Sequence, residues 1–182
     1  MANEFISVIA LFEDESAKII ETYRNSIYSI ADNGNYIPHL TLAVYDKPIN
    51  LDELKAWVDS FCSTHNRLSF NLNSIGVINE GSICLLPDIS RDLYQYYMDI
   101  HQKFEDSCRA FFTPNSNTWI PHIGVSYTTI EDAKTKFPKL MDVFKVTHVT
   151  LKSIRITKRS ELGYETIHEI EISNLSELEG DS

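Results

Sequence analysis

The stretch that decides the fold is residues 36–43, with the sequence YIPHLTLA. It recurs as residues 119–126, with the sequence WIPHIGVS, and the second histidine follows the first by 83 positions (122 − 39 = 83). Aligned, the two copies read aromatic, Ile, Pro, His, aliphatic, small, aliphatic, small. An internal repeat with so long a period indicates two copies of one lobe and not a solenoid of short units.

Each copy predicts a strand that the chain enters through a proline. Proline is tolerated at the first residue of a strand but not inside a central ladder, because it has no N–H to donate. Side chains then alternate between the two faces. The alternation puts His39 beside Thr41, on the face away from the aliphatic residues. In the second copy His122, Gly124 and Ser126 share the corresponding face.

This pair of motifs resembles the signature of the 2H phosphoesterases, a superfamily that includes bacterial RNA 2′,3′-cyclic phosphodiesterases, also called 2′-5′ RNA ligases. Their motif is His-x-Thr/Ser-x, present twice. Residues 39–42 fit it fully, whereas the second copy has His122 but carries Gly124 where a hydroxyl residue is expected. Weaker likenesses around residues 76–87 and 158–164 extend the resemblance over nearly the whole chain.

Two such histidines suit in-line displacement at a phosphodiester. Histidine titrates near neutrality, so one imidazole can act as base while the other acts as acid. The hydroxyl of Thr41 could donate to the non-bridging phosphate oxygens, and Ser126 is the candidate to replace the hydroxyl that Gly124 lacks. Three readings stay open: an active enzyme with an asymmetric site, a slower enzyme, or a module that binds phosphate ends without turnover.

The resemblance implies a metal-independent enzyme without a cofactor that opens a 2′,3′-cyclic phosphate on a nucleotide or short RNA end, or forms a 2′-5′ linkage in reverse. No cluster of cysteines and histidines has the spacing of a zinc site. The four other histidines are expected to serve surface or helix-capping roles: His65, His101, His148 and His168.

Substrate contacts are expected from aromatic side chains next to the motifs, because base stacking tolerates any sequence. The candidates are Tyr36, Tyr45, Trp119 and Tyr127, with packing beside the strands as the alternative role. The chain has 16 Lys and Arg against 26 Asp and Glu, a net charge of −10. This excess of negative charge argues against binding of duplex DNA or long RNA. One basic cluster stands out, with the lysines and the arginines on opposite faces of a strand: Lys152, Arg155, Lys158 and Arg159.

No secretory signal or membrane-length apolar run is found in the sequence. Cys62, Cys84 and Cys108 form no Cys-x-x-Cys pair and are expected to be free thiols. We therefore expect a cytoplasmic protein that contacts no membrane and acts as a monomer.

Apolar periodicity predicts an α+β fold in which strands and helices alternate twice. The expected helices span residues 14–30, 51–64, 89–112 and 130–144, the last bent or split at Pro138. The expected strands are the two motif strands and residues 5–12, 68–78, 82–86, 146–157 and 165–172. Strand 5–12 is expected at an edge, next to one motif strand. The result would be one bilobed domain over residues 1–172, with two antiparallel sheets or sheet halves facing across a cleft and helices outside. An acidic, flexible tail would follow over residues 173–182.

Overall fold

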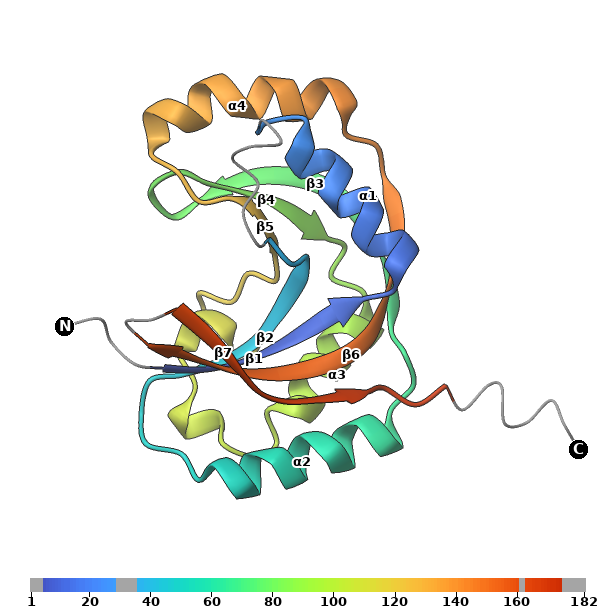
Figure 1. The fold of residues 1–182 in the computed structure, drawn as a ribbon, viewed down its shortest axis with the longest axis vertical. Coiled ribbons are helices and arrows are strands. Elements are labelled where there is room, and N and C mark those ends of the chain that lie inside the picture. The colour runs from blue at the N-terminus through green and yellow to red at the C-terminus, as the bar shows by residue number, and fades with distance from the viewer. Residues whose placement is uncertain (1–4, 29–35, 161–162, 175–182) are drawn as a thin grey trace, which may run out of the picture.

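The computed structural model describes residues 5–28, 36–160 and 163–174 (Figure 1). Its helices are α1 (Asp14–Asn25), α2 (Leu51–Thr64), α3 (Arg91–Ile100) and α4 (Ile130–Val143). Its strands are β1 (Phe5–Phe12), β2 (His39–Tyr45), β3 (Ser69–Ile78), β4 (Ser82–Pro87), β5 (Ile123–Ser126), β6 (Thr147–Ser160) and β7 (Gly163–Glu171). The described residues also include the short 3₁₀ turns η2 (Asn79–Gly81), η3 (Glu105–Ser107) and η4 (Ala110–Phe112).

The strands form one antiparallel sheet of seven strands, in the order β2-β1-β6-β3-β4-β5, with β7 also paired to β6. The long strand β6 divides this sheet into two halves. Its residues 147–150 pair with β3, whereas residues 151–159 pair with β1 and residues 153–160 with β7. The α+β class and the two sheet halves are therefore as the sequence predicted.

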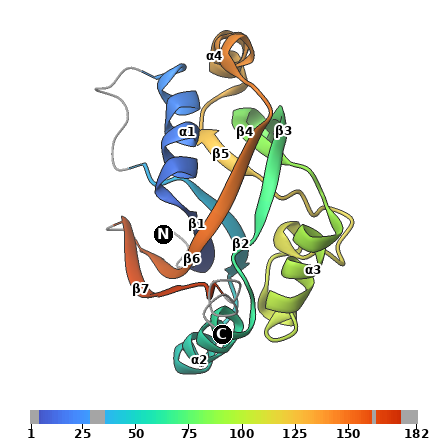
Figure 2. The ribbon, with the colours of Figure 1, turned by 90° about the vertical axis from the view of Figure 1, so that its right-hand side faces the viewer.

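The helices cover the outer faces of the two halves. Helices α1 and α4 lie against the half that contains β3, β4 and β5, and α2 and α3 lie beside the other half (Figures 1 and 2). In α2 the spacing of Leu54, Val58 and Phe61 puts all three on one buried face. Asn50 begins this helix by accepting the backbone N–H groups of Asp52 and Glu53.

Most predicted elements lie within a few residues of the observed ones, and α2 has the predicted bounds. The helix expected over residues 89–112 is wrong in its second half, because α3 ends at Ile100 and the turns η3 and η4 follow. Phe104 has φ of 68°, which a right-handed helix cannot include. The apolar spacing of this segment therefore reflects packing of the turns and not a continuous helix.

Four further expectations need correction or qualification. Strand β1 is not an edge strand, because β6 pairs with its second side and leaves the motif strand β2 at the edge. Helix α4 continues through Pro138 without a split. The tail is held at its start, where the Ser173 N–H donates to the Cys62 carbonyl at 2.9 Å, and residues 175–182 lie outside the described residues. The predicted helix 14–30 ends at Asn25, and its last two predicted residues also lie outside them.

Candidate active site

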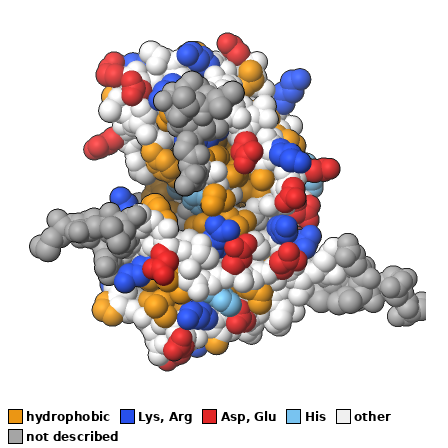
Figure 3. Space-filling view, in the orientation of Figure 1, with side chains coloured by type: hydrophobic (Ala, Val, Ile, Leu, Met, Phe, Trp, Pro, Cys, Tyr) orange, Lys and Arg blue, Asp and Glu red, His pale blue; other side chains and the backbone are white. Residues whose placement is uncertain are grey.

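The two motif strands lie at opposite ends of the strand order, yet they contact each other across the molecule. His39 begins β2, and His122 immediately precedes β5. The charge of His122 also contributes to the pKa of His39, so the two imidazoles are electrostatic neighbours. Figure 3 shows a hollow in the middle of one face of the molecule, where histidine and hydrophobic side chains are visible. The two copies of the repeat therefore form two strands that contact each other between the two sheet halves.

Both histidines are held in the same way. The Nδ1 atom of His39 bonds the carbonyl oxygen of Ile37 at 2.8 Å, and the Nδ1 atom of His122 bonds that of Ile120 at 2.8 Å. A carbonyl oxygen only accepts, so Nδ1 must carry the proton in each ring. The Nε2 atom of a neutral ring is then left with a lone pair, which is the arrangement that a general base needs.

The surroundings of both rings favour the neutral form. Burial lowers the pKa of His39 below its ordinary value, the bond to the Ile37 carbonyl opposes this, and the charges of His122 and Arg155 lower the pKa further. Burial likewise lowers the pKa of His122, and the bond to the Ile120 carbonyl opposes it. Both imidazoles are therefore predominantly neutral at pH 7 in the free protein.

Strand β2 carries a β-bulge within the first motif, directly after Thr41. Thr41 pairs with Ile9, but Ala43 pairs with Val8, so Leu42 is an extra residue on β2. Paired residues share a face, and the alternation therefore resets after Thr41. Ala43 belongs to the hydrophobic core on the outer face, whereas the buried Ile9 lies outside that core, on the side of Thr41.

Strand β5 carries the equivalent bulge. Gly124 pairs with Cys84, but Ser126 pairs with Ile83, so Val125 is the extra residue. The reset turns Ser126 away from the face that holds Gly124. The sequence alternation had placed both on one face, and the extra residue makes that expectation wrong.

Ser126 consequently does not face the space between the motif strands. Its side chain is fully buried, and its hydroxyl hydrogen-bonds the Tyr28 hydroxyl at 2.6 Å, next to the end of α1. A hydroxyl held in this way on the outer face has no access to a ligand between the motif strands. Its expected role as a phosphate donor is therefore corrected to a packing role.

Thr41 keeps the position that the sequence predicted, on the face of His39. Its side chain is half-buried, and within the described part of the chain its hydroxyl has no hydrogen-bond partner. Its backbone is fixed from the other direction, because the Tyr97 hydroxyl donates to the Thr41 carbonyl at 2.7 Å. Thr41 thus combines a held backbone with an available hydroxyl.

Tyr36 serves the second motif strand as Tyr97 serves the first. Its hydroxyl donates to the carbonyl of Gly124 at 2.9 Å, and Gly124 is the position equivalent to Thr41. The Arg24 guanidinium lies 4.3 Å from the centre of the Tyr36 ring. Tyr36 therefore positions an edge strand, and a cation already covers one face of the ring that was expected to stack a base.

The other aromatic candidates divide into packed and exposed side chains. Tyr45 is 2% exposed and packs edge-on against Phe104. The bulge at Leu42 turns Tyr45 into the core, so the expectation that it stacks a base is wrong. Trp119 is half-buried against Tyr97, with ring centres 5.1 Å apart. Tyr127, in contrast, is 64% exposed.

Two aromatic residues that the sequence did not indicate lie beside His122. The ring of Phe111 is 5.6 Å from the imidazole centre and meets it edge-on, and the ring of Phe112 is 6.3 Å away and nearly parallel. Both belong to η4, which the sequence assigned to the end of a long helix. Only their adjacency as an aromatic doublet could have drawn attention to them.

Arg155, which belongs to the basic cluster noted in the sequence, also acts on this site. It pairs with Ile9, which pairs on its other side with Thr41, so the three form one row across β6, β1 and β2. Its guanidinium binds the Glu169 carboxylate at 2.8 Å. Glu169 therefore partly neutralises the one cationic side chain of the basic cluster whose charge acts on His39.

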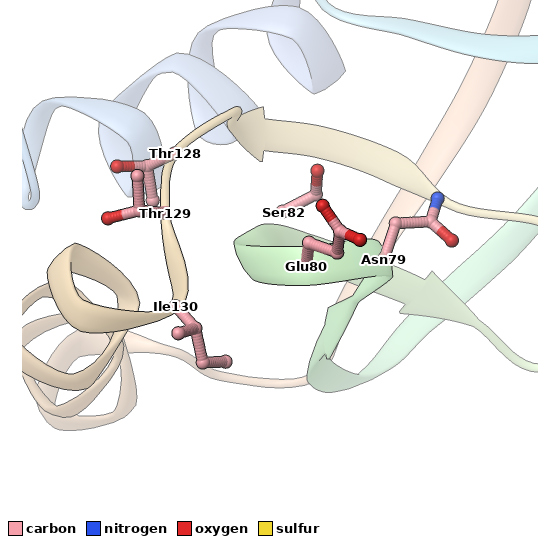
Figure 4. Close-up of a pocket in the computed structure, with 6 residues that line it drawn as sticks. All are labelled: Asn79, Glu80, Ser82, Thr128, Thr129 and Ile130. Carbon is pink, nitrogen blue, oxygen red and sulfur yellow. The ribbon is translucent and has the colours of Figure 1, made fainter.

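A separate pocket of about 690 Å³ lies between the β3–β4 turn and the start of α4 (Figure 4). Asn79, Glu80 and Ser82 line it from the turn, and Thr128, Thr129 and Ile130 line it from the segment that leads into α4. Neither motif histidine lines it. The Thr129 hydroxyl is already engaged there, since it accepts the Asp132 N–H and begins α4.

Outside the motifs, the remaining histidines have structural partners. His65 and His101 are the C-caps of α2 and α3, as expected, although His101 is buried. His148 hydrogen-bonds Asn71, and His168 bonds Asp59 at 2.5 Å. Among residues 5–28, 36–160 and 163–174, no three His, Cys, Asp or Glu side chains are grouped as a metal site would require. No helix in these ranges is long and apolar enough to cross a membrane.

The fold defines the class of protein that this chain resembles. It superposes on a crystal structure of a phosphoesterase with a TM-score of 0.60 and 14% identity, over 93% of this chain and 99% of that one. It also superposes on TT0787 of Thermus thermophilus with a TM-score of 0.57 and 11% identity, over 92% and 97% of the two chains. A third match is the crystal structure of E. coli LigT in complex with NADP⁺, with a TM-score of 0.56 and 12% identity, over 95% of this chain and 99% of that one. A comparison with protein-family profiles finds no match, and neither does a comparison with curated protein sequences. The chain therefore shares its fold with this phosphoesterase, with TT0787 and with LigT.

Proposed function

We propose that the protein is a metal-independent phosphoesterase that opens a 2′,3′-cyclic phosphate, or a related diester, on a nucleotide or short RNA end. The observation that carries the proposal is the matched pair of imidazoles, each with Nδ1 held by a carbonyl two residues earlier. A binding module has little need for two general acid/base groups with identical tautomers. The fold that the chain shares with a phosphoesterase and with LigT supports the same conclusion.

The proposed reaction uses the two Nε2 atoms in complementary roles. One neutral imidazole takes a proton from water as the water oxygen attacks phosphorus, and the ring bond between phosphorus and one ribose oxygen breaks. The other imidazole, protonated, gives its proton to that leaving oxygen, so the product is a phosphomonoester. The Thr41 hydroxyl would donate to a non-bridging oxygen, where negative charge increases in the transition state. Because the two histidines are held alike, either one can be the base, and the other is then the acid.

The substrate that fits best is small and carries a nucleobase. LigT has been crystallised with ATP, with phosphate and with 3′-AMP as well as with NADP⁺. The net charge of −10 disfavours a long polyanion, whereas Phe111 and Phe112 offer apolar surface beside His122. We infer that a nucleoside 2′,3′-cyclic phosphate or a short oligonucleotide end is the substrate.

The test is turnover of a panel of 2′,3′-cyclic nucleotides, an ADP-ribose 1″,2″-cyclic phosphate and 2′-5′ dinucleotides, all with EDTA present. We expect product from at least one cyclic phosphate, and we expect His39→Ala and His122→Ala each to remove nearly all of it. His148→Ala is the matched control, because His148 is exposed on β6 and hydrogen-bonds only Asn71 among the described residues.

The alternative is a module that binds phosphate ends, which the incomplete second motif keeps open. That function would give phosphate-dependent binding of the same ligands without product, and both histidine variants would lower affinity only modestly. Activity that disappears with EDTA and returns with zinc would contradict both functions.

A further inference from the structure

The side chain that Gly124 lacks has its space filled by another residue. A Cβ atom built on Gly124 would lie 2.4 Å from the hydroxyl oxygen of Tyr127 and 2.7 Å from its Cζ atom. Real Cβ atoms do not come so close to other atoms, so the phenol occupies the volume in which a threonine side chain would begin. Gly124 pairs with Cys84, which also contributes to the pKa of Tyr127, so the hydroxyl lies on the face of β5 that Cys84 and Gly124 share.

The phenol reaches this position because the chain leaves the sheet directly after β5. Tyr127 is the first residue beyond that strand, and the following residues lead into α4. The side chain lies back over the strand, so that its hydroxyl is at Gly124 while 64% of the side chain remains exposed. A tyrosine three positions after the glycine thus brings an oxygen to the place where the motif expects one.

The oxygen is suited to donate a hydrogen bond to an anion. Burial of the hydroxyl raises the pKa of Tyr127 to about 12, so it keeps its proton at neutral pH. Within the described part of the chain it has no hydrogen-bond partner, as is true of the Thr41 hydroxyl. Ser126, the other hydroxyl near the second motif, is engaged on the opposite face.

We propose that the Tyr127 hydroxyl is the second phosphate donor of the site, replacing in space the motif hydroxyl that Gly124 lacks. This inference rests on the proposed function and names the residue that completes it. Thr41 would serve the phosphate beside His39, and Tyr127 would serve it beside His122. The glycine is then a requirement of the site and not a defect, because any side chain at position 124 displaces the phenol.

The test compares Tyr127→Phe with Tyr96→Phe on one cyclic nucleotide. Tyr96 lies in α3 and serves as the control, because its hydroxyl also has no hydrogen-bond partner among the described residues. Loss of one such donor costs a factor of about 10²–10³ in kcat. We expect that loss for Tyr127→Phe with an unchanged melting temperature, and no loss for Tyr96→Phe. Wild-type activity in Tyr127→Phe, with His39→Ala inactive, would overturn the Tyr127 assignment alone.

A second experiment moves the hydroxyl from position 127 to position 124. Gly124→Thr should lower activity in the wild-type background, where its side chain collides with the phenol. In the Tyr127→Ala background the space is empty, so Gly124→Thr should raise activity over Tyr127→Ala alone. Failure of the threonine to rescue there, together with an unimpaired Gly124→Thr single variant, would contradict the proposal.

Binding of inorganic phosphate, measured by calorimetry, keeps the inference testable if the wild-type protein proves to have no turnover. The absence of turnover would refute the proposed enzyme. In that case weaker phosphate binding by Tyr127→Phe than by Tyr96→Phe would still support Tyr127 as a donor, and equal affinities would overturn it.

Discussion

Leu42 and Val125 occupy the same position in the two copies of the repeated motif, and each is the extra residue of a β-bulge. Each bulge lies one residue after the position that faces the site, Thr41 in β2 and Gly124 in β5. A bulge re-aims the side chains that follow it and ends regular pairing. The two motif strands therefore share an irregularity as well as a sequence pattern, and in both the bulge ends the alternation that begins at the histidine.

The lowered pKa values of the two histidines predict an acidic optimum. The dependence of kcat/KM on pH reports the free protein, in which both values lie below 6.5. We expect kcat/KM to be greatest below pH 6.5 and to decrease as the pH rises, because the acid imidazole then loses its proton. A bound phosphate anion raises both values, so the profile of kcat should extend to higher pH than that of kcat/KM. A kcat/KM maximum above neutrality would contradict this assignment of the two groups.

The same shifts predict how stability depends on pH. Burial lowers the pKa of His39, His101 and His122, so below pH 6.5 the unfolded chain binds more protons than the folded one. The free energy of unfolding should consequently fall as the pH decreases from 6.5 through the folded-state values. Urea unfolding at a series of pH values measures this slope. The double variant His39→Asn/His122→Asn should reduce the slope.

Much of this arrangement could be predicted from the sequence, because the strands, α2 and the paired histidines follow from local spacing. The bulges could not, since Leu42 and Val125 are ordinary aliphatic strand residues and a bulge depends on the partner strand. Strict alternation therefore placed Ser126 at the phosphate and left Tyr45 as a candidate for base stacking. In the structure the bulges turn both side chains into buried positions away from the site. Alternation also gave no reason to expect the Tyr127 hydroxyl at Gly124, because that contact depends on a turn after the strand.

Gly81 predicts a strong requirement for glycine in the β3–β4 turn. Its φ is +131°, and an added Cβ would lie 2.4 Å from the Thr128 carbonyl oxygen, a backbone atom that cannot move aside freely. Gly163 has a similar φ of +116° but has no atom within 4 Å of such a Cβ, so it reports backbone strain alone. Strain of this kind costs about 1–3 kcal/mol. We expect Gly81→Ala to lower the free energy of unfolding clearly more than Gly163→Ala does, and equal effects would show that the collision relaxes at no cost.

Tyr97 and Tyr96 are neighbours in α3 with opposite hydrogen-bonding states. The Tyr97 hydroxyl donates to the Thr41 carbonyl, whereas the buried Tyr96 hydroxyl has no partner among the described residues. Tyr97→Phe leaves the carbonyl without its donor and should cost about 1–3 kcal/mol of stability. Tyr96→Phe should cost nothing, because it removes only an unpaired group. Denaturant unfolding of the two variants measures the contrast, and a larger loss for Tyr96→Phe would refute it.

Gly124→Ala tests whether Gly124 is needed for activity and not for stability. The added methyl meets only the far end of the Tyr127 side chain, and that side chain is largely exposed and can turn outward. The free energy of unfolding should therefore change by less than about 1 kcal/mol, unlike that of Gly81→Ala. Turnover of a cyclic nucleotide should nevertheless fall by a factor of about 10²–10³, because the displaced phenol no longer donates to the phosphate. In a double-mutant cycle the two changes act on one hydroxyl, so adding Gly124→Ala to Tyr127→Phe should cost little more. Additive losses would mean that the glycine and the tyrosine affect turnover independently, and the phenol would then not be what Gly124 makes room for.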